Sequence, residues 1–188
     1  FQTFEWLVIY PDFMDKAVAY VCTPQFTSYD LLLLSFEIEL IEAGQSAKMP
    51  EKTIQRLGNI VTELFARTPT YRVKHTPRSE FDEFMEKYAK EASAVYTSDD
   101  KASQLRAMKS HDVFAHFNGS MEKAAEAIRA DVLIIVSETD HIVNPQPAID
   151  FARALSCDLV VLKNNCGHLA IGCEVDRCVK IVNQFFNK

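Results

Sequence analysis

Two short, uninterrupted apolar runs in the second half of the chain constrain its fold more than any other feature. Residues 132–136 read VLIIV and residues 159–162 read LVVL, with no polar residue in either run. Strands without polar alternation are typical of parallel sheets that are covered on both faces. Apolar side chains recur at helical spacing in residues 147–155 and again in residues 176–186. This strand–helix–strand–helix order predicts an α/β fold with a parallel sheet.

The beginning of the chain predicts one helix and one more strand. Residues 1–10 carry apolar side chains on nearly every side and stop at Pro11, so we expect a helix that is buried on most faces, inside a larger body. Residues 16–22 (KAVAYVC) form a short run that ends before Pro24, and we expect a strand buried on both faces. The chain begins with Phe and shows no signal-peptide features. We therefore expect it to be part of a longer protein.

The middle of the chain follows a different pattern. Residues 29–115 show helical periodicity and no convincing strand. The expected turns between its helices are polar or contain Pro, at residues 44–50, 68–77 and 97–101. We therefore predict an all-helical lid at residues 29–115, inserted into a core formed by residues 1–28 and 116–188.

Charge and composition argue against several classes of function. The formal net charge of −6 disfavours a surface that neutralises nucleic-acid phosphates. The longest stretch without a charged side chain, residues 17–29, contains a proline and is too short for a membrane helix, so we expect a soluble protein. The glycines stand too far apart for a phosphate-binding loop or a GxSxG turn; they are Gly44, Gly58, Gly119, Gly167 and Gly172.

The cysteines are few and scattered, with no close CxxC pair. They are Cys22, Cys157, Cys166, Cys173 and Cys178. We interpret them as reduced thiols of a cytoplasmic protein and predict no disulfide. A zinc site made by Cys166, His168, Cys173 and Cys178 is an alternative, but the spacing C-x-H-x4-C-x4-C matches no common ligand pattern. We therefore expect no bound metal.

Two loops that follow neighbouring predicted strands each carry an ionisable residue. Asp140 lies in SETDHIVNP and His168 lies in KNNCGHLAIG. The carboxyl ends of parallel strands form the edge where open α/β sheets place their ligands and catalysts. An Asp that accepts a hydrogen bond from one imidazole nitrogen leaves the other nitrogen free to take a proton from a hydroxyl nucleophile. We expect Asp140 and His168 to lie within hydrogen-bond reach, as two thirds of an acyl-transfer triad.

Structural explanations are favoured for the remaining candidates. Ser120 resembles part of a nucleophile turn, but it precedes the strong helix former MEKAAEAIRA and is better explained as a helix N-cap. His141 is expected at the surface or at a pocket rim. For His111 and His116 we expect surface or packing roles, with substrate contact as the alternative. Cys166 is expected to be a small packed thiol, with a reactive thiol as the alternative.

The residues around the predicted pair resemble a known family. The segments ETDHIVNP and NNCGH, in the order Asp loop, helix, strand, Gly-His, resemble the last third of the α/β-hydrolase fold and, within it, the homoserine O-acetyltransferase family. HDVFAHFNGSMEKAAEAIRADVLIIVSETD is similar to that family's passage from the lid into its seventh strand, and FQTFEWLVIYPDFMDKAV to the helix and strand after its nucleophile elbow. The resemblance implies a partial α/β-hydrolase fold, with the last three parallel strands, their flanking helices and an inserted helical lid.

The resemblance also implies roles and partners. Asp140 corresponds to the triad acid and His168 to the triad base, and the serine nucleophile would lie a few residues before Phe1. The implied reaction is ping-pong transfer of an acetyl group from acetyl-CoA, through an acyl-serine, to a homoserine-like acceptor in cytoplasmic methionine biosynthesis, without a bound cofactor. The alternatives are a general esterase or amidase, and a catalytically incomplete chain that has no activity by itself.

The family's strand order carries an expectation about association. The outer neighbour of the strand at residues 16–22 would be the strand that leads into the nucleophile elbow, which this chain does not contain. An exposed strand edge tends to pair with another chain. We therefore expect a homo-oligomer, or association with the missing N-terminal segment, and no nucleic-acid or membrane partner.

Overall fold

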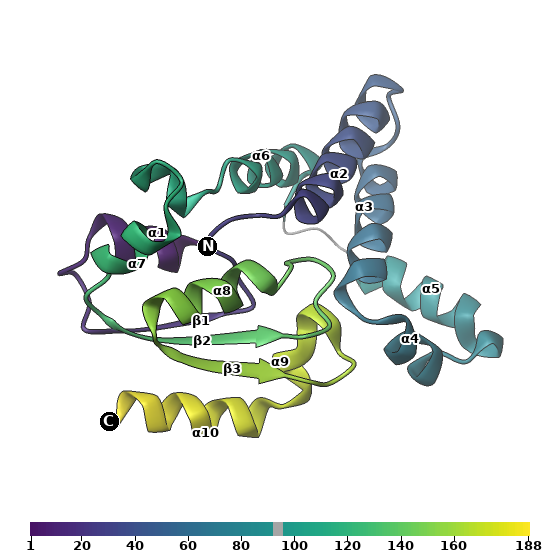
Figure 1. The fold of residues 1–188 in the computed structure, drawn as a ribbon. Helices are drawn as coiled ribbons and strands as arrows, with labels where there is room; N and C mark the ends of the chain where they lie inside the picture. Colours follow the sequence, from purple (N-terminus) through teal and green to yellow (C-terminus); the bar gives the residue numbers. More distant parts are fainter. Residues whose placement is uncertain (92–95) are drawn as a thin grey trace.

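The computed structural model of the chain contains one parallel sheet of three strands, and it describes residues 1–91 and 96–188. The strands are β1 (Lys16–Tyr20), β2 (Asp131–Ser137) and β3 (Asp158–Leu162), in the order β1-β2-β3. Lys16 is opposite Asp131 in the register, and Leu133 is opposite Asp158. The predicted α/β class with a parallel sheet is confirmed, because all three expected strands are present and run the same way (Figure 1).

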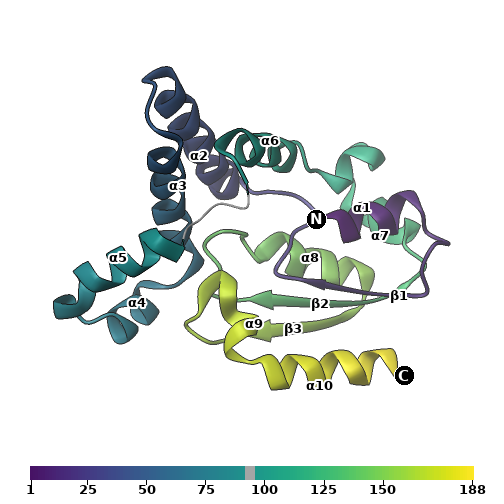
Figure 2. The ribbon, with the colours of Figure 1, turned by 180° about the vertical axis from the view of Figure 1, so that it is seen from behind.

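Helices cover both faces of this sheet. The face of β2 that carries Val132, Ile134 and Val136 packs in one apolar cluster with Phe4 and Phe151. These two phenylalanines come from α1 (Gln2–Ile9) and α8 (Gln146–Leu155), and α7 (Met121–Ala127) lies on the same face. The opposite face of β2, with Leu133 and Ile135, packs against Phe185 of α10 (Val175–Phe186). Figure 2 shows α10 on one side of the strands and α8 on the other.

Two expectations of burial are wrong. β1 buries Ala17 and Ala19, whereas Tyr20 is exposed, so the strand is not buried on both faces. Among the described residues β1 pairs with β2 alone, and an edge strand has one neighbour fewer to cover its side chains. Similarly, α1 buries the stripe formed by Phe4, Leu7 and Val8 but exposes Trp6 and Ile9, and Tyr10, directly after the helix, is exposed as well. Because α1 lies against only one face of the sheet, its apolar composition does not translate into burial on most sides.

A helical segment, residues 28–109, projects from the sheet-bearing part of the molecule (Figure 1). Its helices are α2 (Ser28–Ser46), α3 (Glu51–Ala66), α4 (Pro69–His75), the 3-10 turn η1 (Arg78–Glu80), α5 (Phe81–Glu91) and α6 (Ser98–Lys109). No strand occurs in its described residues. The positions 92–95 of the predicted lid lie outside the described residues, and the division into a core and a lid stays a prediction.

Two of the expected turns in this segment belong instead to helices. Residues 69–75 form α4, because the Thr68 side chain accepts a hydrogen bond from the backbone of Tyr71 and Pro69 occupies the first helical position. Thr97 starts α6 in the same way, through a capping box with Asp100. Thr followed by Pro, or by Asp three residues later, is a start signal as well as a turn signal, and the composition of these stretches did not separate the two.

Three of these helices share an apolar core with the loop that follows β2. Side chains from α2, α3 and α6, among them Leu34, Ile41, Ile54 and Leu105, form one apolar cluster with Val143 of the loop after β2. Three short elements complete the fold: η2 (Val113–Phe117), η3 (Gly167–Leu169) and α9 (Ala170–Cys173). Within the described residues, no helix combines the length and the apolar character needed to cross a membrane.

Candidate active site

Asp140 lies in the loop after β2, with its side chain almost fully buried. Its Oδ1 accepts hydrogen bonds from the backbone N–H groups of Ile142, at 2.8 Å, and Val143, at 2.9 Å. These bonds fix the orientation of the carboxylate and satisfy one of its oxygens. The second oxygen, Oδ2, is thereby directed toward the neighbouring loop after β3.

His168 lies in η3, in that neighbouring loop. Its Nδ1 is 2.8 Å from Oδ2 of Asp140, so the expected hydrogen bond between the two residues is present. The buried carboxylate accepts this bond, which assigns the Nδ1 position as the N–H donor and leaves Nε2 without the proton in the neutral ring. The imidazole is partly exposed, with 28% of the side chain accessible against 1% for Asp140. The arrangement can therefore accept a proton at Nε2 while Asp140 stabilises the charged ring.

Asn164 organises the loop that carries His168. Its side-chain oxygen accepts from the backbone N–H of Cys166 at 2.9 Å, and its amide nitrogen donates to the carbonyl of Ala170 at 3.1 Å and to Glu174 at 2.6 Å. The backbone carbonyl oxygen of Asn164 accepts a hydrogen bond of 2.9 Å from the hydroxyl of Thr139, which lies in the loop of Asp140. One residue thus spans the histidine loop and ties it to the aspartate loop.

Gly167 lets the histidine loop approach the helical segment closely. Its φ is +63°, and a Cβ at this position would lie 2.7 Å from the carbonyl oxygen of Ala66 and 3.1 Å from Cα of Arg67. Both the positive φ and the contact exclude a side chain. The end of α3 therefore packs directly on the backbone that precedes His168.

The helical segment also holds the aspartate loop. Asp30, at the start of α2, is fully buried, and its Oδ1 accepts from the backbone N–H of Asn144 at 2.8 Å. Its Oδ2 accepts from the backbone of Thr27 at 2.7 Å in the capping box of α2. Each loop of the Asp140–His168 pair is thus attached to a helix that lies far away in the sequence.

A pocket of about 480 Å³ opens beside His168. Arg67 and Tyr71 line it from the helical segment, and the guanidinium of Arg67 lies over the Tyr71 ring at 4.3 Å. The other lining residues come from the end of β1 and from the histidine loop: Tyr20, Val21, Leu169, Ile171, Gly172 and Cys173. The pocket therefore offers a cationic group, two phenols and an imidazole to a small molecule.

The prediction that no disulfide forms is wrong, since Cys166 and Cys173 are bonded to each other. The same bond contradicts the expectation that Cys166 is a packed thiol, and it removes two sulfurs from the alternative zinc site. The turn formed by η3 and α9 brings the two Cα atoms to 6.5 Å, within the range for a disulfide, and the spacing alone does not reveal this turn. Because disulfides persist mainly in oxidising compartments, the bond gives no support to a cytoplasmic location. Cys22, Cys157 and Cys178 are free thiols.

The other predicted residues lie outside the His168 pocket. Ser120 caps α7 by accepting from the backbone of Lys123 at 3.2 Å, so its assignment as a cap is confirmed. His141 is exposed. His111 has packing contacts, with Nε2 at 2.9 Å from the carbonyl oxygen of Thr23, and His116 is a surface residue.

Several residues that shape the site were missed in the sequence. Arg67 and Tyr71 are not among the predicted site residues. Tyr71 falls within residues 68–77, which were expected to form a turn, and Arg67 directly precedes that stretch. The Thr68-Pro69 start signal would have placed α4 and thus directed attention to the helix that bears Tyr71. Asn164 had no sequence signal apart from its position after a strand.

The chain is similar to solved structures, although no family model and no curated protein sequence matches it. Homoserine O-acetyltransferase from Bacillus anthracis superposes with a TM-score of 0.86 at 19% identity, covering 97% of this chain and 56% of that one. An acetylester hydrolase from Corynebacterium glutamicum superposes with a TM-score of 0.82 at 15% identity, covering 100% of this chain and 58% of that one. A third similar structure is MGS-M2, an alpha/beta hydrolase enzyme from a Medee basin deep-sea metagenome library. It superposes with a TM-score of 0.75 at 18% identity, covering 98% of this chain and 60% of that one.

At these identities the likeness establishes the fold. The chain has part of the α/β-hydrolase fold: a three-stranded parallel sheet with flanking helices and a helical segment between β1 and β2. It spans a little more than half the length of the first of these neighbours.

Proposed function

We propose that Asp140 and His168 are the acid and the base of a serine-dependent acyl-transfer enzyme. The observation that supports this most directly is the 2.8 Å bond between the buried Asp140 carboxylate and the His168 imidazole, at a pocket that His168 lines. In the proposed reaction, Nε2 of His168 takes the proton of the serine hydroxyl as it attacks the acyl carbonyl. The same nitrogen then returns the proton to the leaving group.

The nucleophile in this proposal belongs to the longer protein. Among the described serines, Ser120 has a structural role as the cap of α7, and the family resemblance puts the reactive serine before Phe1. The chain by itself would then lack the acyl-enzyme step, since the members of a triad act as a unit. Among the described residues, the outer edge of β1 has no strand partner. In this proposal, the missing segment or a second copy of the chain would pair with that edge.

Acetyl transfer from acetyl-CoA to a homoserine-like hydroxyl is the finer form of the proposal, with no bound cofactor. It rests on the resemblance around Asp140 and His168 and on the similarity to a homoserine O-acetyltransferase structure. Simple ester hydrolysis is the second candidate, because an acetylester hydrolase superposes with a similar TM-score. The two reactions share the same acid and base and differ in whether water or the acceptor hydroxyl attacks the acyl-serine.

Release of CoA thiol from acetyl-CoA, with and without homoserine, separates these possibilities. We expect no turnover by the 188-residue chain and turnover by a protein extended upstream in its reading frame. In the extended protein, His168→Ala should remove activity, whereas the matched cap variant Ser120→Ala should retain it. Release that depends on homoserine supports transfer, and equal release without it supports hydrolysis. Activity of the chain alone that is lost in Ser120→Ala would contradict the proposal.

A further inference from the structure

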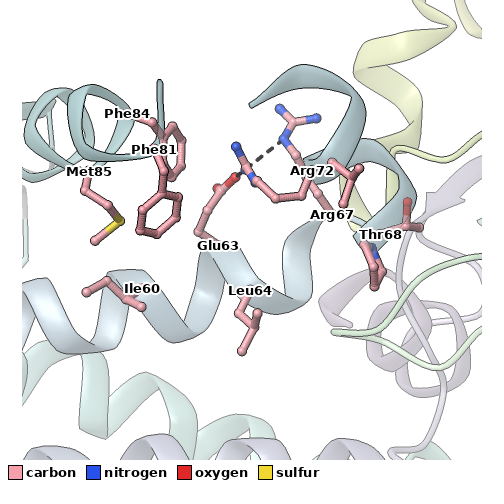
Figure 3. Close-up of a pocket in the computed structure, with 11 residues that line it drawn as sticks. Ile60, Glu63, Leu64, Arg67, Thr68, Arg72, Phe81, Phe84 and Met85 are labelled. Atoms are coloured by element: carbon pink, nitrogen blue, oxygen red, sulfur yellow. Dashed lines mark hydrogen bonds and ion pairs between the residues drawn. The ribbon is translucent and has the colours of Figure 1, made fainter. Parts of the chain in front are cut away.

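A second pocket, of about 330 Å³, lies between α3, α4 and α5 in the helical segment (Figure 3). Its described lining is dominated by apolar side chains, among them Ile60, Leu64, Val73, Phe81, Phe84 and Met85. Its volume falls at the lower end of the range for small-molecule sites, about 300–1,000 Å³. The predominance of apolar and aromatic lining is also typical of such sites.

The apolar lining is open to solvent. Leu64 is 70% exposed and Val73 is 78% exposed, although both face the same hollow as Phe81. Covering apolar surface contributes about 25 cal/mol per Å², so a ligand that fills this hollow gains free energy without displacing any part of the fold. The flexible side chain of Met85 suits a ligand of variable shape.

Polar groups gather beside the aromatic side chains of the same pocket. Glu63 of α3 forms an ion pair with Arg72, and its Oε1 is 3.8 Å from Nε of Arg67. The Arg72 guanidinium also lies 4.3 Å from the centre of the Phe84 ring, as Figure 3 illustrates. Arg72 forms the closer ion pair with the Glu63 carboxylate, and the Arg67 guanidinium, whose Nε lies 3.8 Å from it, is placed to complement an anionic head group.

Arg67 connects this pocket with the candidate active site. It lines both the apolar pocket and the pocket beside His168, and it follows directly after the last residue of α3. A molecule with its head group at Arg67 can therefore direct a hydrocarbon chain away from His168, along α3 and α5.

The size of the pocket favours a small molecule over a protein partner. Eleven described residues line it, whereas a stable protein interface involves about 20–30 residues on each side. We infer that this pocket binds a medium-length acyl chain whose carboxylate head lies at Arg67. That the bound acyl chain is part of the enzyme's substrate rests on the proposed function. The binding of a fatty carboxylate to the pocket does not depend on that function.

Octanoate is a suitable probe, and its binding to the 188-residue chain can be followed by NMR titration or calorimetry. We expect saturable binding. Leu64→Gln should raise the dissociation constant about tenfold, through the loss of an apolar contact. The matched control is Leu32→Gln, because Leu32 of α2 is equally exposed but does not line the pocket. This variant should leave the dissociation constant unchanged. Because both leucines lie at the surface, neither variant threatens folding.

Head-group recognition is tested with a second variant and a second probe. Arg67→Gln should weaken octanoate binding about tenfold and leave the binding of 1-octanol nearly unchanged, since only the carboxylate needs the cation. His168→Ala should leave octanoate binding intact, and this separates the pocket from the proposed acyl transfer. Absence of octanoate binding, equal binding by Leu64→Gln, or a self-association that Leu64→Gln abolishes would overturn the inference.

Discussion

The hydroxyl of Thr68 donates a hydrogen bond of 2.6 Å to the carbonyl oxygen of Asn165, across 97 positions of the sequence. The same hydroxyl oxygen accepts from the backbone N–H of Tyr71 at 3.0 Å and so starts α4. One side chain therefore supports both the helix that brings Tyr71 to the pocket and the loop that carries His168. The geometry of the candidate site depends on this contact as well as on the sheet.

Thr68→Val should lower the free energy of unfolding by about 1–2 kcal/mol, because it removes the helix cap and the hydrogen bond to the carbonyl of Asn165. Urea denaturation followed by circular dichroism measures this change. Thr68→Ser keeps the hydroxyl and is the matched control. If the valine and serine variants were equally stable, the hydrogen bond would have no structural role.

Gly167→Ala should destabilise the protein more than Gly119→Ala. Both glycines have positive φ, +63° and +81°, but a Cβ meets nothing within 4 Å at Gly119 and would approach the backbone of Ala66 at Gly167. We expect a loss of about 1–2 kcal/mol at Gly119 from the backbone conformation alone. At Gly167 we expect about 1–3 kcal/mol more from the contact. Equal losses in denaturation experiments would show that α3 does not press on the histidine loop.

The disulfide predicts three reactive thiols in the denatured, unreduced protein and five after reduction. Reduction should lower the stability by about 2 kcal/mol, the size expected for closing a short loop. It should also speed hydrogen exchange at residues 166–173, which surround His168. Cys173→Ser, at an exposed position, should reproduce the reduced state without added thiol. Five free thiols before reduction would exclude the bond.

His111 should make stability depend on pH. Burial of the ring lowers the pKa of His111 below its ordinary value of 6.5, and the hydrogen bond to Thr23 and the charge of Glu5 oppose this only in part. The unfolded chain therefore binds the proton more readily than the folded one. The stabilisation is fully present above the unfolded pKa and is lost as the pH falls through the lower folded pKa.

Urea midpoints measured between about pH 5 and pH 8 test this expectation. His111→Gln should flatten the acid side of the profile, since the amide keeps a donor for the carbonyl of Thr23 but does not titrate. His141→Gln, at an exposed histidine, should leave the profile unchanged. An identical slope in wild type and His111→Gln would assign the pH dependence to other groups.

The local pattern of apolar residues was sufficient to predict the strands of the sheet. It was insufficient to predict the surroundings of the candidate site. The uninterrupted runs around Ile134 and Val160 identified β2 and β3, because strands covered on both faces need apolar side chains at every position. The same reasoning failed for Tyr20 and Trp6, whose exposure depends on which neighbours cover them. The turn-forming residues of the stretch that contains α4 led to the prediction of a turn, although Thr68 and Pro69 form a helix start signal.

The sequence by itself determined the α/β class, the order of the strands along the chain and the placement of Asp140 and His168 after neighbouring strands. These follow from periodicity and from the rule that parallel strands end at one edge. Only the tertiary structure decided that Cys166 meets Cys173, that Gly167 packs on Ala66 and that Arg67 lies between two pockets. Such contacts depend on how elements pack in three dimensions, and neither spacing nor composition encodes that packing.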